Sequence, residues 1–250
     1  MSTFKTMLKV ESKITIRSLD SIFFGVFFPV GIVLLLGIIY GNKPAFEGAN
    51  YTFMQQSFGA LITIGICATG LMGIPLVVSD NRDKKILKRF QVTPISPAVL
   101  LTVQIFISFI ISIVSSAAVY GISAIFFGYR FIGNLGGFLL SYLLVTIAIY
   151  SLGMLLASIS PNLKVANLLC TLIYFPMLFL SGATVPYEIM PSAMQNVVDV
   201  LPLTQGIKLL KGFSLGNDVG SLIFPICLML GIAIICTVLS LKLFKWEYNS

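Results

Sequence analysis

Hydrophobic and polar positions separate along this chain on a long scale, because charged residues divide it into extended uncharged runs. Six runs each exceed the roughly 20 residues that a helix needs to cross the hydrocarbon core of a bilayer. They lie between Asp20 and Lys43, Glu47 and Asp80, Arg89 and Arg130, Arg130 and Lys164, Lys164 and Glu188, and Asp218 and Lys242. The pattern predicts an all-α membrane protein, a single domain over residues 1–250, with spans at residues 22–41, 54–78, 99–122, 135–158, 165–186 and 219–241.

Composition supports this class. The chain is 57% hydrophobic and 10% charged, with a mean hydropathy of +1.00, far more apolar than an ordinary globular domain. The first run is too long for the core of a signal peptide, so we expect it to be retained. Small residues at four-residue spacing, Gly65, Thr69 and Gly73 in the second span and Gly153 and Ala157 in the fourth, predict close helix contacts. The spacing fits contacts within one chain and contacts across a dimer equally well.

Lysine and arginine are distributed unevenly between the two sides of the membrane. With the N-terminus inside, the cytoplasmic segments hold twelve of these residues and the outer segments only four. Since cytoplasmic loops carry the excess of basic residues, both termini are predicted to be cytoplasmic. The net charge of +7 is then a signal of topology, and we expect no nucleic-acid partner.

Several kinds of chemistry are absent from the sequence. There is no histidine, and the four cysteines lie inside predicted spans without paired spacing, so no metal or redox site is expected. No predicted span holds an ionisable residue, which argues against an ion-coupled carrier or a membrane-embedded hydrolase. No phosphate-binding G-x-x-x-x-G-K-[ST] loop occurs. The chain is therefore predicted not to be an enzyme, but a passive pore, a scaffold, or the membrane half of a machine whose motor is another polypeptide.

Two basic segments are predicted to lie on the cytoplasmic side. In residues 1–20, Lys5, Lys9, Lys13 and Arg17 recur every four residues, which predicts an interfacial helix with one basic stripe. A simple positive-inside anchor is the alternative.

The second segment covers residues 80–94. On a helix from Asp80 to Phe90, Ile86, Leu87 and Phe90 share one face, and basic side chains occupy the other, before Thr93-Pro94 ends the helix. Such a helix is suited to dock into a groove on a partner protein. The alternative is a loop that only fixes topology.

Here the sequence resembles a family. "SDNRDKKILKRFQVTPISPAVLL" from Ser79 is similar to the first cytoplasmic loop of type-2 ATP-binding-cassette (ABC) exporter permeases. "FLSGATVPYEIMPSAMQNVVDVLPLTQGIKLLKG" from Phe179 is similar to the outer segment after their fifth span. Two departures occur: Asp80 stands where the family usually has Glu, and the Gly often found in the loop is replaced around Lys84-Lys85-Ile86.

The resemblance implies a half-transporter in the cell membrane. Two permease chains, in a homodimer, would work with two copies of a separate ABC ATPase that binds ATP and Mg, while this chain holds no cofactor. The resemblance implies that the loop helix sits in a groove of the ATPase. The coupling residues would be Asp80, Arg82, Asp83, Lys84, Leu87, Lys88, Arg89, Phe90, Thr93 and Pro94.

On the outer side, the resemblance implies short re-entrant helices in residues 187–218 that cap the pathway. The outer gate would comprise Ser181, Gly182, Pro186, Pro191 and Pro202. An ordinary external loop is the alternative.

The predicted pathway is uncharged, and its larger polar groups near span ends are Gln55, Gln56, Gln104 and Asn167. Pro176 is predicted to kink the fifth span, either as a hinge or as a purely structural proline. This pathway suits export of a hydrophobic or amphipathic cargo such as a drug, peptide or lipid-linked molecule. A passive channel or scaffold, and ABC-type sodium extrusion, are the alternatives.

Overall fold

The computed structural model describes residues 3–17, 22–41, 43–45, 51–87, 97–183, 187 and 190–245. Within these ranges the regular structure is helical, apart from one isolated bridge between Pro44 and Thr52. Six helices are long and apolar enough to cross a membrane: Phe23–Tyr40, Phe53–Asp83, Leu101–Phe127, Leu135–Ile159, Leu163–Leu180 and Val219–Leu243. The prediction of an all-α protein with six spans is confirmed.

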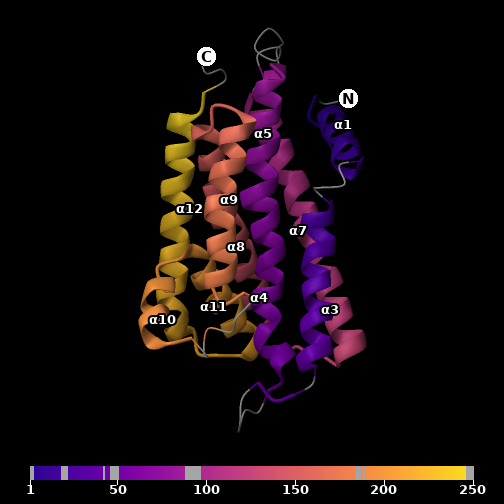
Figure 1. Cartoon of the computed structure of the whole chain (residues 1–250), viewed down its shortest axis with the longest axis vertical. Helices are drawn as coiled ribbons and strands as arrows, with labels where there is room; N and C mark the ends of the chain where they lie inside the picture. Colours follow the sequence, from indigo (N-terminus) through magenta and orange to yellow (C-terminus); the bar gives the residue numbers. More distant parts are fainter. Residues whose placement is uncertain are drawn as a thin grey trace.

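The spans run side by side, and both termini lie at the same end of the bundle, at the top of Figure 1. We call this the terminal end and the opposite one the distal end. On one side lie α1 (Thr3–Arg17), η1 (Phe23–Phe27), α3 (Phe28–Tyr40) and α7 (Pro97–Phe127). On the other lie α8 (Leu135–Ile159), α9 (Leu163–Leu180) and α12 (Ile223–Leu243).

The second span runs between these two groups. It consists of α4 (Phe53–Cys67), the π-helical turn η2 (Ala68–Gly73) and α5 (Ile74–Asp83). Its most apolar stretch is 78% buried, against 22% for the first span. The second span is thus the centre of the packing, and the first, third, fifth and sixth present apolar faces outward as lipid-facing helices do.

Close helix contacts occur at Gly65 and Gly153 as predicted, whereas a Cβ atom on Gly73 would meet only the Ala68 carbonyl oxygen of its own span at 3.9 Å. A Cβ atom on Gly153 of α8 would overlap the carbonyl oxygen of Gly70, and one on Gly65 would meet Ser115 Oγ at 2.7 Å. Both contacts lie within one chain. The wide turn η2 coincides with the Gly70–Gly153 crossing, and the periodicity of the sequence had not predicted it.

Some span boundaries differ from those predicted. The second span continues to Asp83, five residues beyond the predicted end, and the fifth ends at Leu180. Helix α9 continues through Pro176.

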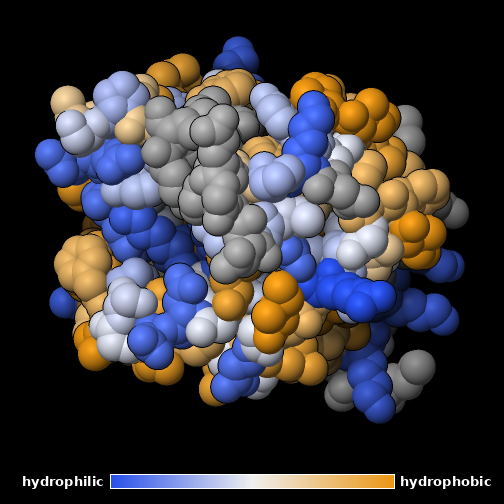
Figure 2. Space-filling model, turned by 90° about the horizontal axis from the view of Figure 1, so that it is seen from below, coloured by the Kyte–Doolittle hydropathy of each residue, from blue (hydrophilic) through white to orange (hydrophobic). Residues whose placement is uncertain are grey.

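At the distal end, α10 (Ser192–Val198) and α11 (Pro202–Leu215) connect the fifth span to the sixth, whose first turn is η4 (Val219–Leu222). Helix α11 packs against α4, α8 and α12 and buries Leu203, Leu209 and Leu210. Figure 2 views this end, where hydrophilic residues are interspersed with hydrophobic ones. Helix α11 is therefore part of the packed bundle, while the re-entry of this segment into a bilayer stays a prediction.

Candidate functional site

A groove with a volume of about 730 Å³ opens between the two groups of helices. One wall comes from α1, η1 and α7, and the other from η2, α5 and α9. Its apolar surface includes Phe24, Met72, Leu76, Ile111 and Phe175. This volume falls within the range that holds drug-sized molecules, roughly 300–1,000 Å³.

Polar side chains interrupt the apolar walls. Gln104 and Ser108 of α7 are 5% and 3% exposed and line the groove, as does Thr69 of η2. The Thr69 hydroxyl lies 2.9 Å from both the Gly65 carbonyl oxygen and the Tyr150 hydroxyl, which fixes its position. A few oriented polar groups on an apolar surface are what a ligand with both kinds of surface requires.

One region of the groove is charged. Asp80 and Lys164 both line it, and the Asp80 carboxylate accepts a hydrogen bond of 2.6 Å from Lys84 Nζ. The Lys84 side chain is 64% exposed, so this ion pair faces solvent and contributes little to stability. The groove therefore combines an apolar body with a charged region open to solvent, near the terminal end.

The segment after the second span differs from its predicted form. Helix α5 ends at Asp83, Lys84 and Lys85 form a turn, and helical structure resumes at Ile86 and Leu87. Lys85 has φ +56°, a left-handed conformation that interrupts a helix. The prediction of one continuous helix from Asp80 to Phe90 is wrong at this turn.

Arg82 does not lie on an exposed basic face. Its side chain is 6% exposed, and Nη1 donates to the carbonyl oxygens of Ala157, at 3.0 Å, and Ser160. Nη2 donates to the carbonyl oxygen of Lys245 at 2.9 Å, and the guanidinium lies 5.6 Å from the centre of the Phe244 ring. The predicted outward orientation of Arg82 is wrong because backbone carbonyls near the ends of α8 and α12 accept hydrogen bonds from Nη1 and Nη2 inside the protein.

Leu87 is also turned inward. It is 1% exposed and packs in a cluster with Met7 of α1 and Val103 and Ile107 of α7. The prediction that this side chain is available to a partner is wrong, since its apolar surface is already covered within the chain. Asp83, Lys84 and Lys85 are exposed. Lys88, Arg89, Phe90, Thr93 and Pro94 lie outside the described residues.

Helix α1 presents its lysines outward. Lys5, Lys9 and Lys13 are exposed, while Met7 is buried against the rest of the chain. Glu11 is partly buried, and this burial raises the pKa of its carboxyl above the ordinary value. The basic stripe is present on the described part of α1, and its contact with lipid stays a prediction.

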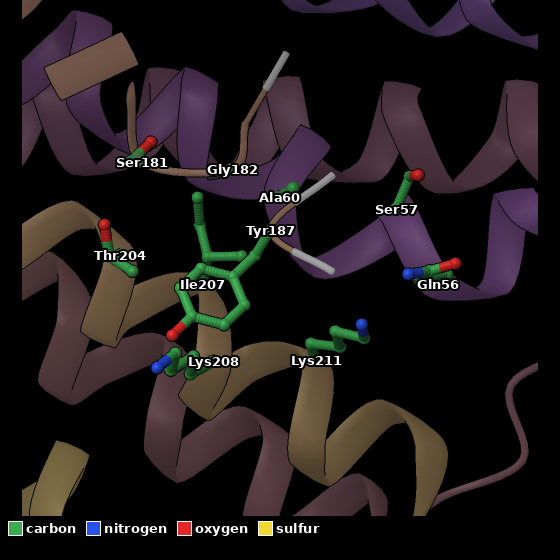
Figure 3. A pocket seen from close by; sticks show the side chains of 10 residues that line it. All are labelled: Gln56, Ser57, Ala60, Ser181, Gly182, Tyr187, Thr204, Ile207, Lys208 and Lys211. Carbon is green, nitrogen blue, oxygen red and sulfur yellow. The ribbon is translucent and has the colours of Figure 1, made fainter. Parts of the chain in front are cut away.

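At the distal end a small cavity of about 40 Å³ lies between α4, the end of α9 and α11 (Figure 3). Ser181 and Gly182 line it, with Gly182 at φ +91°, where glycine is favoured. Lys208 Nζ lies 2.6 Å from the Asp199 carboxylate and 4.1 Å from the centre of the Tyr187 ring. Figure 3 shows that ring across the middle of the cavity.

The other predicted gate residues are dispersed. Pro191 precedes α10 and Pro202 begins α11, so both mark helix starts. Pro186 lies outside the described residues.

The predicted pathway residues do not meet at one place. Asn167 lines the groove, as does Gln104, but Gln56 lines the distal cavity. Gln55 forms a capping box with Thr52 at the start of α4. Pro176 is exposed on α9. Sequence reasoning identified Thr69 only as a helix-contact position and did not identify Ser108, because a small hydroxyl residue in a span gives no signal that separates a groove position from an ordinary packing position.

Among the described residues, no three His, Cys, Asp or Glu side chains come together as metal ligands would.

Comparison with known proteins identifies a family of membrane transporters, in agreement with the bundle of apolar helices. Residues 2–214 match the family described as ABC-2 type transporter. The chain is 35% identical over 86 residues to nodulation protein J of Rhizobium leguminosarum bv. viciae, which covers 34% of this chain and 32% of that protein. It is 36% identical over 74 residues to nodulation protein J of Rhizobium meliloti (strain 1021), covering 30% and 28%. The chain thus aligns with about a third of the length of these curated relatives.

The family match extends from the first helix to the end of α11 and includes the groove, the loop after the second span and most of the distal segment. Members of this family are membrane permeases rather than ATPases, and membership implies an ABC ATPase as partner. This chain belongs to the ABC-2 type transporter family and is a multi-pass membrane permease component of a transporter.

Proposed function

We propose that this chain is the permease of an ATP-driven exporter that moves a hydrophobic or amphipathic molecule, such as a drug, peptide or lipid-linked compound, out of the cytoplasm. The observation that carries this proposal is the groove of about 730 Å³, whose apolar body and charged region match a molecule with an apolar part and a polar part. The cargo would enter the groove near the terminal end and leave at the distal end.

The charge distribution supports a cytoplasmic terminal end. Basic residues gather there on α1, around Lys84 and Lys85, at Lys164, in the last turn of α12 at Lys242, and after it at Lys245. Because basic residues favour the cytoplasmic side, both termini would lie inside and the protein would sit in the cytoplasmic membrane.

Exposed side chains at the terminal end would form the contact with the ATPase. Asp83, Lys84 and Lys85 are exposed beside the groove, and residues 88–94 follow them in the sequence. Two ATPase copies, which bring ATP and Mg, would serve a homodimer of this chain. Since the interior of the groove contacts α5, movement of this loop would reach the cargo site directly.

The distal segment would form the outer gate. Helix α11 is buried against three spans, and Ser181 and Gly182 meet it at the small distal cavity. Short helices packed inside a bundle are tolerated at membrane depth because protein covers their polar ends. This supports a re-entrant cap above the pathway.

Placing a large side chain in the groove tests whether the cargo passes through it. In proteoliposomes that contain the chain and its ATPase, Asn167→Trp should lower ATP-dependent transport of a fluorescent amphipathic dye about tenfold, the effect of losing roughly 1.4 kcal/mol of binding. Leu168→Trp is the matched control, because Leu168 is 59% exposed on the same helix and does not line the groove.

Equal transport by the two variants would contradict the groove as the pathway. Dye flux that needs no ATP would instead favour a passive channel, and sodium flux that depends on ATP would favour sodium extrusion.

A further inference from the structure

Arg82 lies where the ends of several helices meet. Its guanidinium donates to the carbonyl oxygens of Ala157 and Ser160 at the end of α8 and to that of Lys245, which follows α12. The next residue, Asp83, accepts a hydrogen bond of 2.9 Å from Leu163 N, the first residue of α9. The end of α5 is therefore attached to α8, α9 and α12 together.

These attachments suit an arginine in particular. The last carbonyl groups of a helix have no partner within the helix and carry its negative dipole end. A guanidinium presents several donors in a fixed plane and keeps its charge, so it can bind carbonyls from two chain segments at once. The ammonium group of a lysine is a single point of attachment and could not bridge both segments in the same way.

The same loop has a second attachment on the opposite side of the groove. Leu87, five residues after Arg82, is buried against Met7 of α1 and against Val103 and Ile107 of α7. Helix α7 contacts α1 and α3 on one side, and α8 contacts α5, α9 and α12 on the other. The short segment from Arg82 to Leu87 thus connects helices of the two walls of the groove.

We propose that Arg82 is a positioning residue for transport. Together with Asp83, it fastens α5 to the ends of α8, α9 and α12, so that displacement of the loop by the ATPase moves these helices as one unit relative to α1 and α7. The width of the groove then changes with the state of the ATPase. This inference rests on the proposed function.

The experiment measures groove width directly. In a cysteine-free chain, spin labels are placed at Phe24→Cys and Asn167→Cys, which line opposite walls. Labelled chain is diluted into unlabelled chain, assembled with the ATPase in nanodiscs, and the distance between labels is measured by pulsed electron paramagnetic resonance without nucleotide and after trapping with ATP and vanadate. The otherwise unmodified chain should show two different distances.

Arg82→Gln should keep the ATPase bound and hydrolysing ATP within twofold of the unmodified rate, yet give the same distance in both states. A merely structural role would lower assembly or thermal stability without separating hydrolysis from groove movement. Arg130→Gln is the matched control, since Arg130 is exposed in the connection between α7 and α8, outside the groove, and it should behave as the unmodified chain.

A full distance change in Arg82→Gln overturns the inference and leaves the proposed function intact. If Arg82→Gln does not assemble with the ATPase, Arg82→Lys is measured in its place. A distance change that is at most half of that in the unmodified chain supports the inference, and a larger one overturns it. No distance change in the unmodified complex overturns the proposed function and this inference with it.

Discussion

Gly153 determines how closely the second and fourth spans approach. A Cβ atom there would overlap the carbonyl oxygen of Gly70, which is backbone and cannot move aside without shifting η2. Four-residue spacing of small residues predicted a close contact, but only the structure identifies Gly70 as its partner. This crossing sits beside the groove, because η2 forms part of its wall.

Gly153→Leu should therefore destabilise the protein by about 1–3 kcal/mol, the usual cost of overpacking a close contact. Thermal unfolding of the detergent-solubilised protein measures this. Gly121→Leu is the matched control, since a Cβ at Gly121 meets nothing within 4 Å. If the two variants melt at the same temperature, the two helices do not approach as described.

Arg82 illustrates a residue whose role the sequence could not predict. A charged residue in a basic loop normally faces water, so the sequence pattern places Arg82 on the same exposed face as Lys84 and Lys88. Its hydrogen-bond partners are carbonyl groups 75 and 163 positions away in the sequence. No local pattern encodes a backbone carbonyl as a partner, and only the arrangement of the spans brings these groups together.

Among the elements, helix α1 depends on the loop after the second span. Leu87 is buried against Met7, and Phe4 and Leu8 pack beside the same cluster. Truncating a buried leucine to alanine usually costs about 2–5 kcal/mol, and Leu87 is one of the four buried residues of this cluster within the described part of the chain.

Leu87→Ala should accordingly detach α1 and speed tryptic cleavage at Lys5, Lys9 and Lys13 in the purified protein. Ile14→Ala is the control, because Ile14 is 57% exposed on the same helix. Unchanged cleavage in Leu87→Ala would mean that this leucine does not hold α1, and its contact with a partner would regain support.

The sequence predicts which segments span the membrane, but it does not predict where each helix ends. An uncharged run of more than 20 residues is long enough to cross the bilayer. Within lipid, its backbone N–H and C=O groups must hydrogen-bond to each other, and a helix achieves this within the run itself. The extension of α5 to Asp83 depends instead on partners in α8, α9 and α12, and the burial of α11 depends on the space between α4, α8 and α12. The π-helical turns η1 and η2 likewise arise from packing and have no signature in the hydrophobic pattern.

At the scale of the whole molecule, the two groups of helices are joined differently at the two ends. Toward the distal end, α4 packs on α3 and α7 as well as on α11, so the groups are held together. Toward the terminal end the groove lies between its two walls, and the segment from Arg82 to Leu87 crosses from one wall to the other. This arrangement favours opening at the terminal end, where the basic residues gather.

The central claim is that the terminal end binds the ATPase and faces the cytoplasm. The most direct measurement is photo-crosslinking in intact cells that carry both genes, with a benzophenone amino acid placed at Lys85 or at Asn217, which are exposed at opposite ends of the molecule. The account predicts a covalent adduct between this chain and the ATPase from residue 85 and none from residue 217. An adduct from residue 217, or none from residue 85 in a complex that still co-purifies with the ATPase, would contradict it.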